Sequence, residues 1–164
     1  MHPNAQLLER FYKGFAALDP APMVAAYAAN ATFSDPAFPD LKGPQVPAMW
    51  TMLCARAKDF SLTFRDVQAD DARGQVHWEA AYTFGGKRKV HNVIDASFVF
   101  EGGLIVQHVD RFDFKLWARQ ALGPAGLLLG WTGFLRTQVQ SQARAGLVAF
   151  MATRGEGATR ASSP

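Results

Sequence analysis

Cysteine is nearly absent from the sequence: Cys54 is the single one in 164 residues. One cysteine excludes an internal disulfide, and a chain without disulfides suits a reducing compartment, so we expect a cytoplasmic protein. Long apolar runs are absent as well, and the first residues lack the charged-then-apolar pattern of a signal peptide. We therefore expect no membrane partner.

Strong charge clustering and metal-ligand spacing are also missing. The chain carries 17 Lys and Arg against 14 Asp and Glu, and its one basic cluster, residues 87–89, falls at the tip of a predicted hairpin. A solvated turn explains such a cluster, so no nucleic-acid partner is expected. Histidines and carboxylates occur without the spacing of a metal site, so we expect no metal and no cofactor.

The most informative stretch runs from His91 to Phe114. Two apolar runs rich in β-branched and aromatic residues meet there at Gly102–Gly103. Apolar runs of this kind on either side of a glycine pair predict a β-hairpin. Polar residues interrupt both runs, and their placement depends on how the two strands pair.

A turn centred on the two glycines opposes Asp95 to Asp110 and Ser97 to His108. All four side chains then share one face, because side chains alternate along a strand. A slip by two residues would place Asp95 opposite His108 instead. A slip by one residue, or a bulge, would separate the group.

The rest of the chain divides into helical and strand-like segments by the period of its apolar residues. Spacing of three and four predicts helices over residues 7–18, 19–27, 46–57 and 132–150, with a helical turn at 116–122. Alternation predicts further strands over residues 31–34, 62–67 and 75–84. Prolines at 36, 39 and 44, with a fourth just beyond at 47, predict a loop over residues 35–44.

Three helices followed by a run of antiparallel strands indicate an α+β fold, with the helices on one face of a curved sheet. We expect a cone-shaped barrel with three N-terminal helices over its mouth (1–116), a C-terminal helical extension (117–154) and a disordered tail (155–164). Phe98 and Phe100 are predicted on the back of the sheet. A second copy of the chain is the simplest cover for an apolar back, so we expect a homodimer through it.

Four segments resemble the nuclear transport factor 2-like superfamily: residues 10–18, ATFSDP at 31–36, VIDASF at 93–98 and IVQHVDRFDF at 105–114. Within it the chain is similar to the SnoaL-like branch, which includes ketosteroid isomerases, polyketide cyclases and limonene epoxide hydrolases. The resemblance covers residues 4–116 and implies the cone-shaped fold. It does not fix the activity, because this fold hosts enzymes, binding proteins and assembly modules.

Resemblance to the ketosteroid isomerases implies roles for two aspartates. Their general-base aspartate matches Asp35, and their proton-donating oxyanion aspartate matches Asp95. Their oxyanion tyrosine, however, falls on Phe11, and the neighbouring Tyr12 points about 100° away on a helix. One of the two enolate stabilisers is therefore missing.

Resemblance to the polyketide cyclases and epoxide hydrolases implies a role for Asp110, which matches a working aspartate of their terminal strand. The epoxide hydrolases also need an arginine between two aspartates. Arg111 has the wrong parity to share a face with Asp95 and Asp110, which argues against epoxide hydrolysis.

Three functional hypotheses follow. In the first, the chain is an isomerase, cyclase or lyase that moves a proton next to a carbonyl of a small apolar substrate. Asp95 and Asp110 are its acid and base, His108 assists them, and Asp35 is a second candidate base. Two carboxylates about 5 Å apart in an apolar pocket cannot both ionise cheaply, which gives an acid beside a base.

The second hypothesis is a non-catalytic binding protein for small apolar molecules, and the third is a dimeric assembly module. Both enzyme and binder need a pocket. Its candidate substrate-binding residues are the aromatic side chains and one histidine expected along the cone: Phe11, Phe15, Tyr27, Trp50, Phe64, Trp78, Tyr82, His91 and Phe112.

Overall fold

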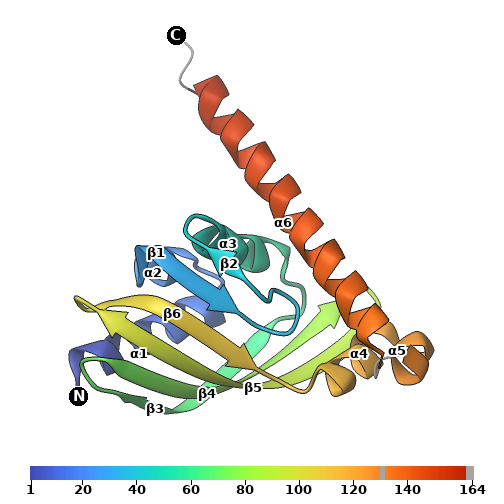
Figure 1. The fold of residues 1–164 in the computed structure, drawn as a ribbon, viewed down its shortest axis with the longest axis horizontal. Coiled ribbons are helices and arrows are strands. Elements are labelled where there is room, and N and C mark those ends of the chain that lie inside the picture. The colour runs from blue at the N-terminus through green and yellow to red at the C-terminus, as the bar shows by residue number, and fades with distance from the viewer. Residues whose placement is uncertain (130–131, 162–164) are drawn as a thin grey trace.

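The computed structural model describes residues 1–129 and 132–161 (Figure 1). Its helices are α1 (Pro3–Ala16), α2 (Ala21–Val24), α3 (Gln45–Arg56), α4 (Phe114–Leu122), α5 (Pro124–Leu129) and α6 (Gly133–Ala161). Its strands are β1 (Tyr27–Ser34), β2 (Leu41–Lys42), β3 (Ser61–Ala69), β4 (Arg73–Phe84), β5 (Arg88–Glu101) and β6 (Leu104–Arg111). The predicted α+β class, with N-terminal helices, a curved sheet and a C-terminal helical extension, is confirmed.

The six strands form one curved, open sheet in the order β2-β1-β6-β5-β4-β3 (Figure 1). The strands from β3 to β6 pair antiparallel along the chain, as predicted. Strand β1 instead lies parallel to β6. This pairing brings the segment after β1 beside the end of β6, which sets two distant parts of the chain around one site.

A bulge in the β5–β6 hairpin decides which side chains face inward. Next to the turn, Glu101 pairs with Leu104 and Phe100 with Ile105, as a turn centred on the two glycines requires. The next pair is Val99 with Gln107, so Val106 is an extra residue on β6. Because side chains alternate along a strand, one extra residue moves every later side chain of β6 to the opposite face.

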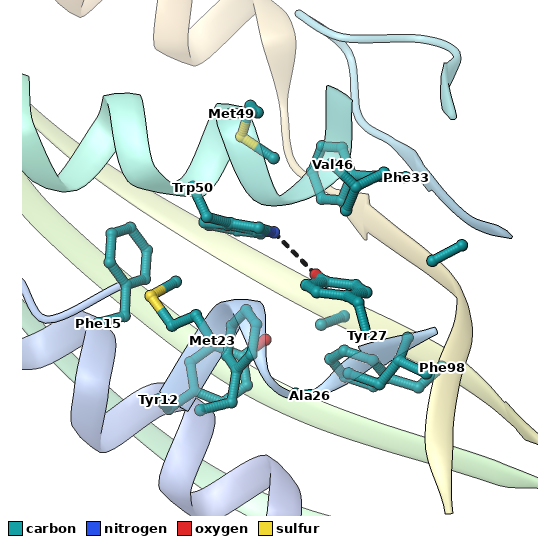
Figure 2. Packing of buried hydrophobic residues seen from close by; sticks show 14 of the residues in the cluster. Tyr12, Phe15, Met23, Ala26, Tyr27, Phe33, Val46, Met49, Trp50 and Phe98 are labelled. Carbon is teal, nitrogen blue, oxygen red and sulfur yellow. Dashed lines mark hydrogen bonds between the residues drawn. The ribbon is translucent and has the colours of Figure 1, made fainter. Parts of the chain in front are cut away.

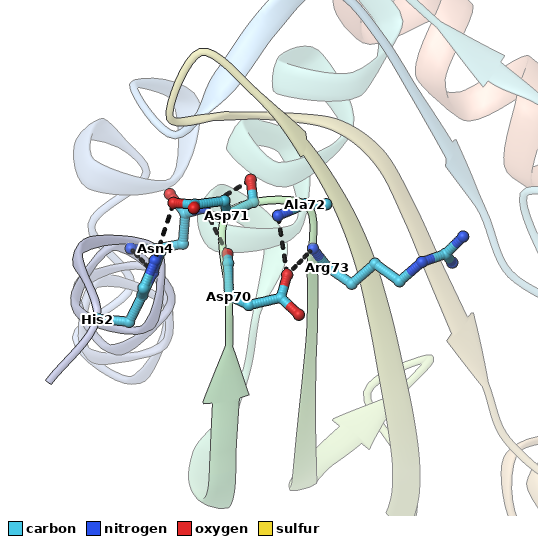
Figure 3. A network of polar contacts seen from close by, with 6 residues as sticks. All are labelled: His2, Asn4, Asp70, Asp71, Ala72 and Arg73. Atoms are coloured by element: carbon cyan, nitrogen blue, oxygen red, sulfur yellow. Dashed lines mark hydrogen bonds and ion pairs between the residues drawn. The ribbon is translucent and has the colours of Figure 1, made fainter.

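The N-terminus of α1 is fixed to the turn between β3 and β4 (Figure 3). Pro3 stands in the first turn of the helix, and the His2 side chain accepts a hydrogen bond from the N–H of Asn4. The Asn4 side chain donates to the Asp70 carbonyl at 2.8 Å. Asp70 in turn accepts the N–H groups of the turn residues that follow it. These contacts satisfy groups that a helix start leaves unpaired and hold α1 across the sheet.

The C-terminal extension packs on the sheet through α4 and then along α3 through α6. The Asp113 side chain caps α4, and Gly123, with a φ of 61°, ends it. Helix α6 begins at the end of the molecule where α4 and α5 lie, passes α3, and extends beyond the rest of the body (Figure 1). Among the described residues, no helix is both long and apolar enough to cross a membrane.

Leu147 attaches α6 to the main core: it is 1% exposed and belongs to the same cluster as α1, α3 and the inner face of the sheet. We expect Leu147→Ala to lower the free energy of unfolding by about 2–4 kcal/mol, because it leaves a cavity. Val148, 58% exposed, is the matched control, and Val148→Ala should change it by less than about 0.5 kcal/mol. Urea unfolding measures both. Equal effects would show that α6 is not docked through Leu147.

Several elements differ from the sequence-based expectation. Tyr27 is the first residue of β1 instead of part of the second helix, and the short strand β2 lies within the proline-rich stretch predicted as a loop. Residues 124–129, which lack a clear apolar period, form α5. Helix α6 continues to Ala161, past residue 155 where the disordered tail was expected to begin, and residues 162–164 lie outside the described part of the chain.

Phe98 and Phe100 are the main correction to the packing. They were predicted on the back of the sheet, but both are buried in the core on its inner face. The prediction was wrong because it assumed that His108 and Asp110 share a face with Asp95. The homodimer therefore loses the apolar surface on which it was based, and it stays a prediction.

Candidate functional site

A cavity of about 460 Å³ lies on the inner face of the sheet, under α3 and against α4. This volume is typical of small-molecule sites. Its wall is mostly aromatic and aliphatic, and its two carboxyl groups are those of Asp35 and Asp110. Four lining residues are exposed and mark the mouth: Arg56, Lys58, Phe84 and Gly85.

The regular spacing of side chains along β4 and α3 explains why these residues face the cavity. On β4, alternation directs Trp78, Ala80 and Tyr82 inward. On α3, Met49 and Leu53 lie one turn apart and face the cavity together. Both patterns were visible in the sequence, so the wall follows from local periodicity.

Asp110 reaches the cavity because of the bulge at Val106. It pairs with Ala96 across the hairpin, and His108 pairs with Phe98. Both polar side chains therefore point inward: His108 is fully buried, and Asp110 is 4% exposed. Asp95 pairs with Arg111 and points to the opposite face.

A continuous chain of hydrogen bonds runs behind the cavity wall to Asp110. Trp50 Nε1 donates to the Tyr27 hydroxyl at 2.8 Å (Figure 2). That hydroxyl is 2.6 Å from His108 Nδ1, and His108 Nε2 is 2.9 Å from Asp110 Oδ1. Trp78 Nε1 donates to the same oxygen at 3.5 Å. Buried polar groups are costly when unpaired, so this chain accounts for the polar side chains of an otherwise apolar core.

The donors and acceptors fit one arrangement of protons. The Tyr27 oxygen accepts from Trp50, so its own O–H is free to donate to His108 Nδ1. His108 then carries its proton on Nε2 and donates it to Asp110. Asp110 receives two N–H donors at Oδ1, which fits its carboxylate form and leaves Oδ2 for a ligand.

Tyr27→Phe tests this chain. Loss of the hydroxyl leaves Trp50 Nε1 and His108 Nδ1 buried without their partner, which should cost about 1–3 kcal/mol of stability. Nitrogen NMR of the wild type should show His108 protonated at Nε2. In the variant the share of the Nδ1-protonated form should rise, because nothing donates to Nδ1. An unchanged tautomer and an unchanged urea midpoint would contradict the assignment.

Asp35 is the second carboxyl of the cavity and directly follows β1, whose last residue, Ser34, pairs with Val109 next to Asp110. Its Oδ1 accepts the N–H groups of Ala37 at 2.7 Å and Phe38 at 2.5 Å, which closes a tight turn. Burial against the apolar wall raises the pKa of Asp35 to about 7. The Phe38 N–H opposes this rise, the charge of Asp110 adds to it by a smaller amount, and the Ala37 N–H opposes it least. Near neutral pH this carboxyl is therefore available both as an acid and as a base.

The C-terminal extension contributes to the site. Trp117 of α4 lines the cavity, and its Nε1 donates to the Tyr82 hydroxyl at 2.9 Å. Gln140 of α6 donates to the Pro36 carbonyl at 3.0 Å, next to Asp35. Both contacts tie the extension to cavity residues, so α4 and α6 are part of the site's frame.

The structure brings most of the predicted site residues to the cavity. Those that line it are Asp35, Asp110, Phe15, Trp50, Trp78, Tyr82 and Phe112. His108, Tyr27 and Phe11 lie behind the wall: the first two belong to the hydrogen-bond chain, and the Phe11 ring packs edge-on against both. Phe64 stacks on Tyr12, away from the cavity, and the buried Tyr12 hydroxyl has no partner among the described residues.

Asp95 and His91 are corrected: both lie on the outer face of the sheet. Asp95 is 79% exposed and accepts from His77 at 2.8 Å, and His91 contacts Glu79 at 2.8 Å. The pairing of Asp95 with Asp110 as acid and base is therefore wrong. Among the described residues, no group of three or more histidine, cysteine, aspartate and glutamate side chains is arranged to hold a metal.

Other lining residues were missed by the sequence reasoning, among them Phe38, Phe60, Asn92, Ile94 and Trp117. For Asn92 and Ile94 the alternation of β5 was recognised, but the wrong face was taken as the inner one. Trp117 lay beyond the segment that resembles known families, and nothing in its local sequence points to the cavity.

Residues 8–108 match a protein family described as the SnoaL-like domain. A comparison with curated proteins finds no match. The matched segment runs from α1 into β6. It covers Asp35 and His108 and ends two residues before Asp110.

Solved structures share the fold at low sequence identity. An epoxide hydrolase of Mycobacterium tuberculosis resembling limonene epoxide hydrolase is 19% identical, with a TM-score of 0.59 over 81% of this chain and 95% of that one. A ketosteroid isomerase-like protein of Catenulispora acidiphila, in complex with trimethylamine, is 15% identical, with a TM-score of 0.64 over 80% and 99%. A candidate polyketide cyclase of Xanthomonas campestris is 18% identical, with a TM-score of 0.59 over 73% and 96%. Identities this low establish the shared fold and leave the activity open.

Proposed function

This chain belongs to the SnoaL-like domain family of the nuclear transport factor 2-like superfamily, and from that premise we propose that it is an acid–base enzyme. In this proposal it binds a small apolar carbonyl compound in the cavity and moves a proton next to the carbonyl, as an isomerase or cyclase does. The observation that carries the proposal is the pair of Asp35 and Asp110. Two carboxyls in different environments share one apolar cavity.

Asp110 is the proposed base. The two N–H donors at Oδ1 fix the carboxylate, and Oδ2 takes a proton from the carbon next to the substrate carbonyl. The electron pair of that C–H bond moves into the carbon–carbon bond, and the carbonyl oxygen becomes an enolate. Apolar walls strengthen the interactions of these charges because little water competes with them.

Asp35 is the proposed acid. With its pKa raised to about 7 it keeps a proton near neutral pH and can donate it to the enolate oxygen. In a substrate with a carbon–carbon double bond next to the deprotonated carbon, the enol is conjugated with that double bond. Return of the proton from Asp110 to the far carbon of the double bond, with Asp35 recovering its own proton, then re-forms the carbonyl, gives an isomer and regenerates both groups. This division of roles replaces the one expected from the sequence, in which Asp95 was the acid.

The fold relatives are compatible with this proposal. One is named as an epoxide hydrolase and another as a candidate polyketide cyclase, and each description applies to that protein. Among the described residues that line the cavity, the arginine is Arg56, and it lies at the exposed mouth and not on the buried wall with the two carboxyls. Proton transfer therefore fits the cavity better than epoxide opening does.

Deuterium exchange tests the proposal. The protein is incubated in heavy water with a panel of small cyclic and straight-chain ketones, and mass spectrometry measures deuterium at the carbon next to the carbonyl, while calorimetry measures binding. We expect binding and catalysed exchange for at least one compound. Asp95→Asn, which removes an outer-face carboxylate, should leave both unchanged.

Two outcomes would contradict the proposal. Binding without exchange would identify a non-catalytic binding protein. Neither binding nor exchange would leave the assembly module as the surviving hypothesis.

A further inference from the structure

The mouth of the cavity carries positive charge, whereas its interior carries two carboxyls. Arg56 ends α3 and Lys58 follows it, and both exposed side chains line the cavity. Phe84 and Gly85 line the mouth as well, and they follow Thr83, whose N–H donates to the Lys58 carbonyl at 2.9 Å. A ligand that fills the cavity therefore meets cations at the end that faces solvent.

Neither cation is neutralised by a carboxylate in the described part of the chain. The ion pairs there involve other residues, and the carboxylate nearest in sequence, Asp59, instead accepts the Thr83 hydroxyl at 2.6 Å. Unpaired cations beside an apolar cavity favour an anion at that place.

Helix α6 holds the Arg56 guanidinium at the mouth. The guanidinium carbon of Arg56 lies over the Phe150 ring, 5.7 Å from its centroid, and that of Arg154 lies over the same ring at 5.7 Å. A Cβ atom at Gly146 would lie 3.4 Å from Arg56 Nη1, so the helix backbone is close to this group. Stacking on a ring leaves guanidinium N–H groups free to bind a carboxylate or phosphate.

We propose that the ligand is an amphipathic anion, with an apolar body that carries the reacting carbonyl and an anionic group at the opposite end. The body fills the cavity so that the carbonyl lies between Asp35 and Asp110. Its carboxylate or phosphate binds Arg56 and Lys58 at the mouth. This inference rests on the proposed function for the reacting end, and on the unpaired cations for the anionic end. The opposite arrangement would place an anion beside Asp110 and the cations beside apolar groups.

Calorimetry with octanoate and methyl octanoate tests the anionic end, because the two differ in charge and share the apolar chain. At about pH 6, Asp35 is mostly protonated and octanoate is ionised. We expect octanoate to bind the wild type about tenfold more tightly than its ester. In the double variant Arg56→Gln with Lys58→Gln, most of that preference should disappear.

The matched control removes one arginine and one lysine from the exposed side of α1, as Arg10→Gln with Lys13→Gln. It should keep the preference for octanoate. Arg56→Lys, which keeps the charge, should retain most of it as well. Added salt should weaken binding of octanoate and leave binding of the ester unchanged, a result that needs no variant to fold.

Each outcome decides the proposal. Equal binding of octanoate and ester by the wild type would overturn the anionic end and leave the acid–base function standing. A preference that survives in the double variant would show that other groups bind the anion. If neither compound binds while neutral ketones exchange deuterium, the proposed anionic group of the ligand is contradicted and the acid–base function stands. If none of these compounds binds or exchanges, both proposals fail.

Discussion

Asp110→Asn should lower turnover at least ~100-fold, the usual scale for loss of a general acid or base. The amide keeps the shape of the carboxyl, and its oxygen can still accept from His108 and Trp78, so the fold should survive. It cannot take up a proton from the substrate. Binding of a neutral ligand should change little, which separates a catalytic role from a structural one.

The same variant should also change Asp35. The charge of Asp110 contributes to the raised pKa of Asp35, so the pKa of Asp35 should fall when that charge is removed. Steady-state rates and a pH titration of the variant measure the two effects. Full activity in Asp110→Asn, with activity unchanged in the outer-face control Asp95→Asn, would exclude Asp110 as the base.

Asp35→Asn should remove the proposed general acid and at the same time stabilise the folded protein at alkaline pH. The pKa of Asp35 is about 7 in the folded chain against 3.8 ordinarily. Between these values the unfolded chain releases a proton that the folded chain retains, so the wild type loses stability as the pH rises from about 4 to about 7. Above about pH 7 Asp35 is ionised in both the folded and the unfolded chain, so the stability lost through this group no longer changes with pH.

Asparagine at position 35 cannot ionise, and its side-chain oxygen can still accept from Ala37 and Phe38. At about pH 8 we expect the variant to be about 1–3 kcal/mol more stable than the wild type, with little difference near pH 4. Urea unfolding at both pH values measures this. A variant less stable than the wild type at about pH 8 would show that Asp35 is a structural carboxylate and not a functional one.

Local periodicity predicted most of the fold. The helices over α1 and α3, the alternation of β4 and the hairpin of β5 and β6 all follow from the spacing of apolar residues. Strand β2 and the first residues of β1 were missed, because pairing with distant strands and not local sequence makes them extended. Helix α5 has no amphipathic period and forms where its glycine packs on α4.

The site predicted from the sequence is wrong because the register of the β5–β6 hairpin shifts by one residue. The turn at the two glycines was located correctly, and the pairs beside it follow from it. The extra residue Val106 then reversed the faces of β6 relative to β5. Nothing in the local sequence marks this bulge, since valine fits a regular strand as well as a bulged one. It moved Asp95 out of the site and left Asp110 and His108 in it.

The role of Asp35 shows a second limit. Its position after β1 was recognised from a family resemblance, but its proximity to Asp110 depends on the parallel pairing of β1 with β6. The raised pKa depends on walls contributed by several distant elements. Both the proximity of the two carboxyls and the raised pKa arise from tertiary packing, so they cannot be predicted from single segments of the sequence.

Carbon NMR of the Asp35 carboxyl across a pH series tests the central claim most directly. The proposed acid exists only if Asp35 retains its proton well above the ordinary range of an aspartate. We expect a titration midpoint near the pKa of about 7 in the wild type and a lower midpoint in Asp110→Asn. A midpoint near 3.8, unchanged in the variant, would show that Asp35 is ionised at neutral pH, and would contradict the acid–base pair.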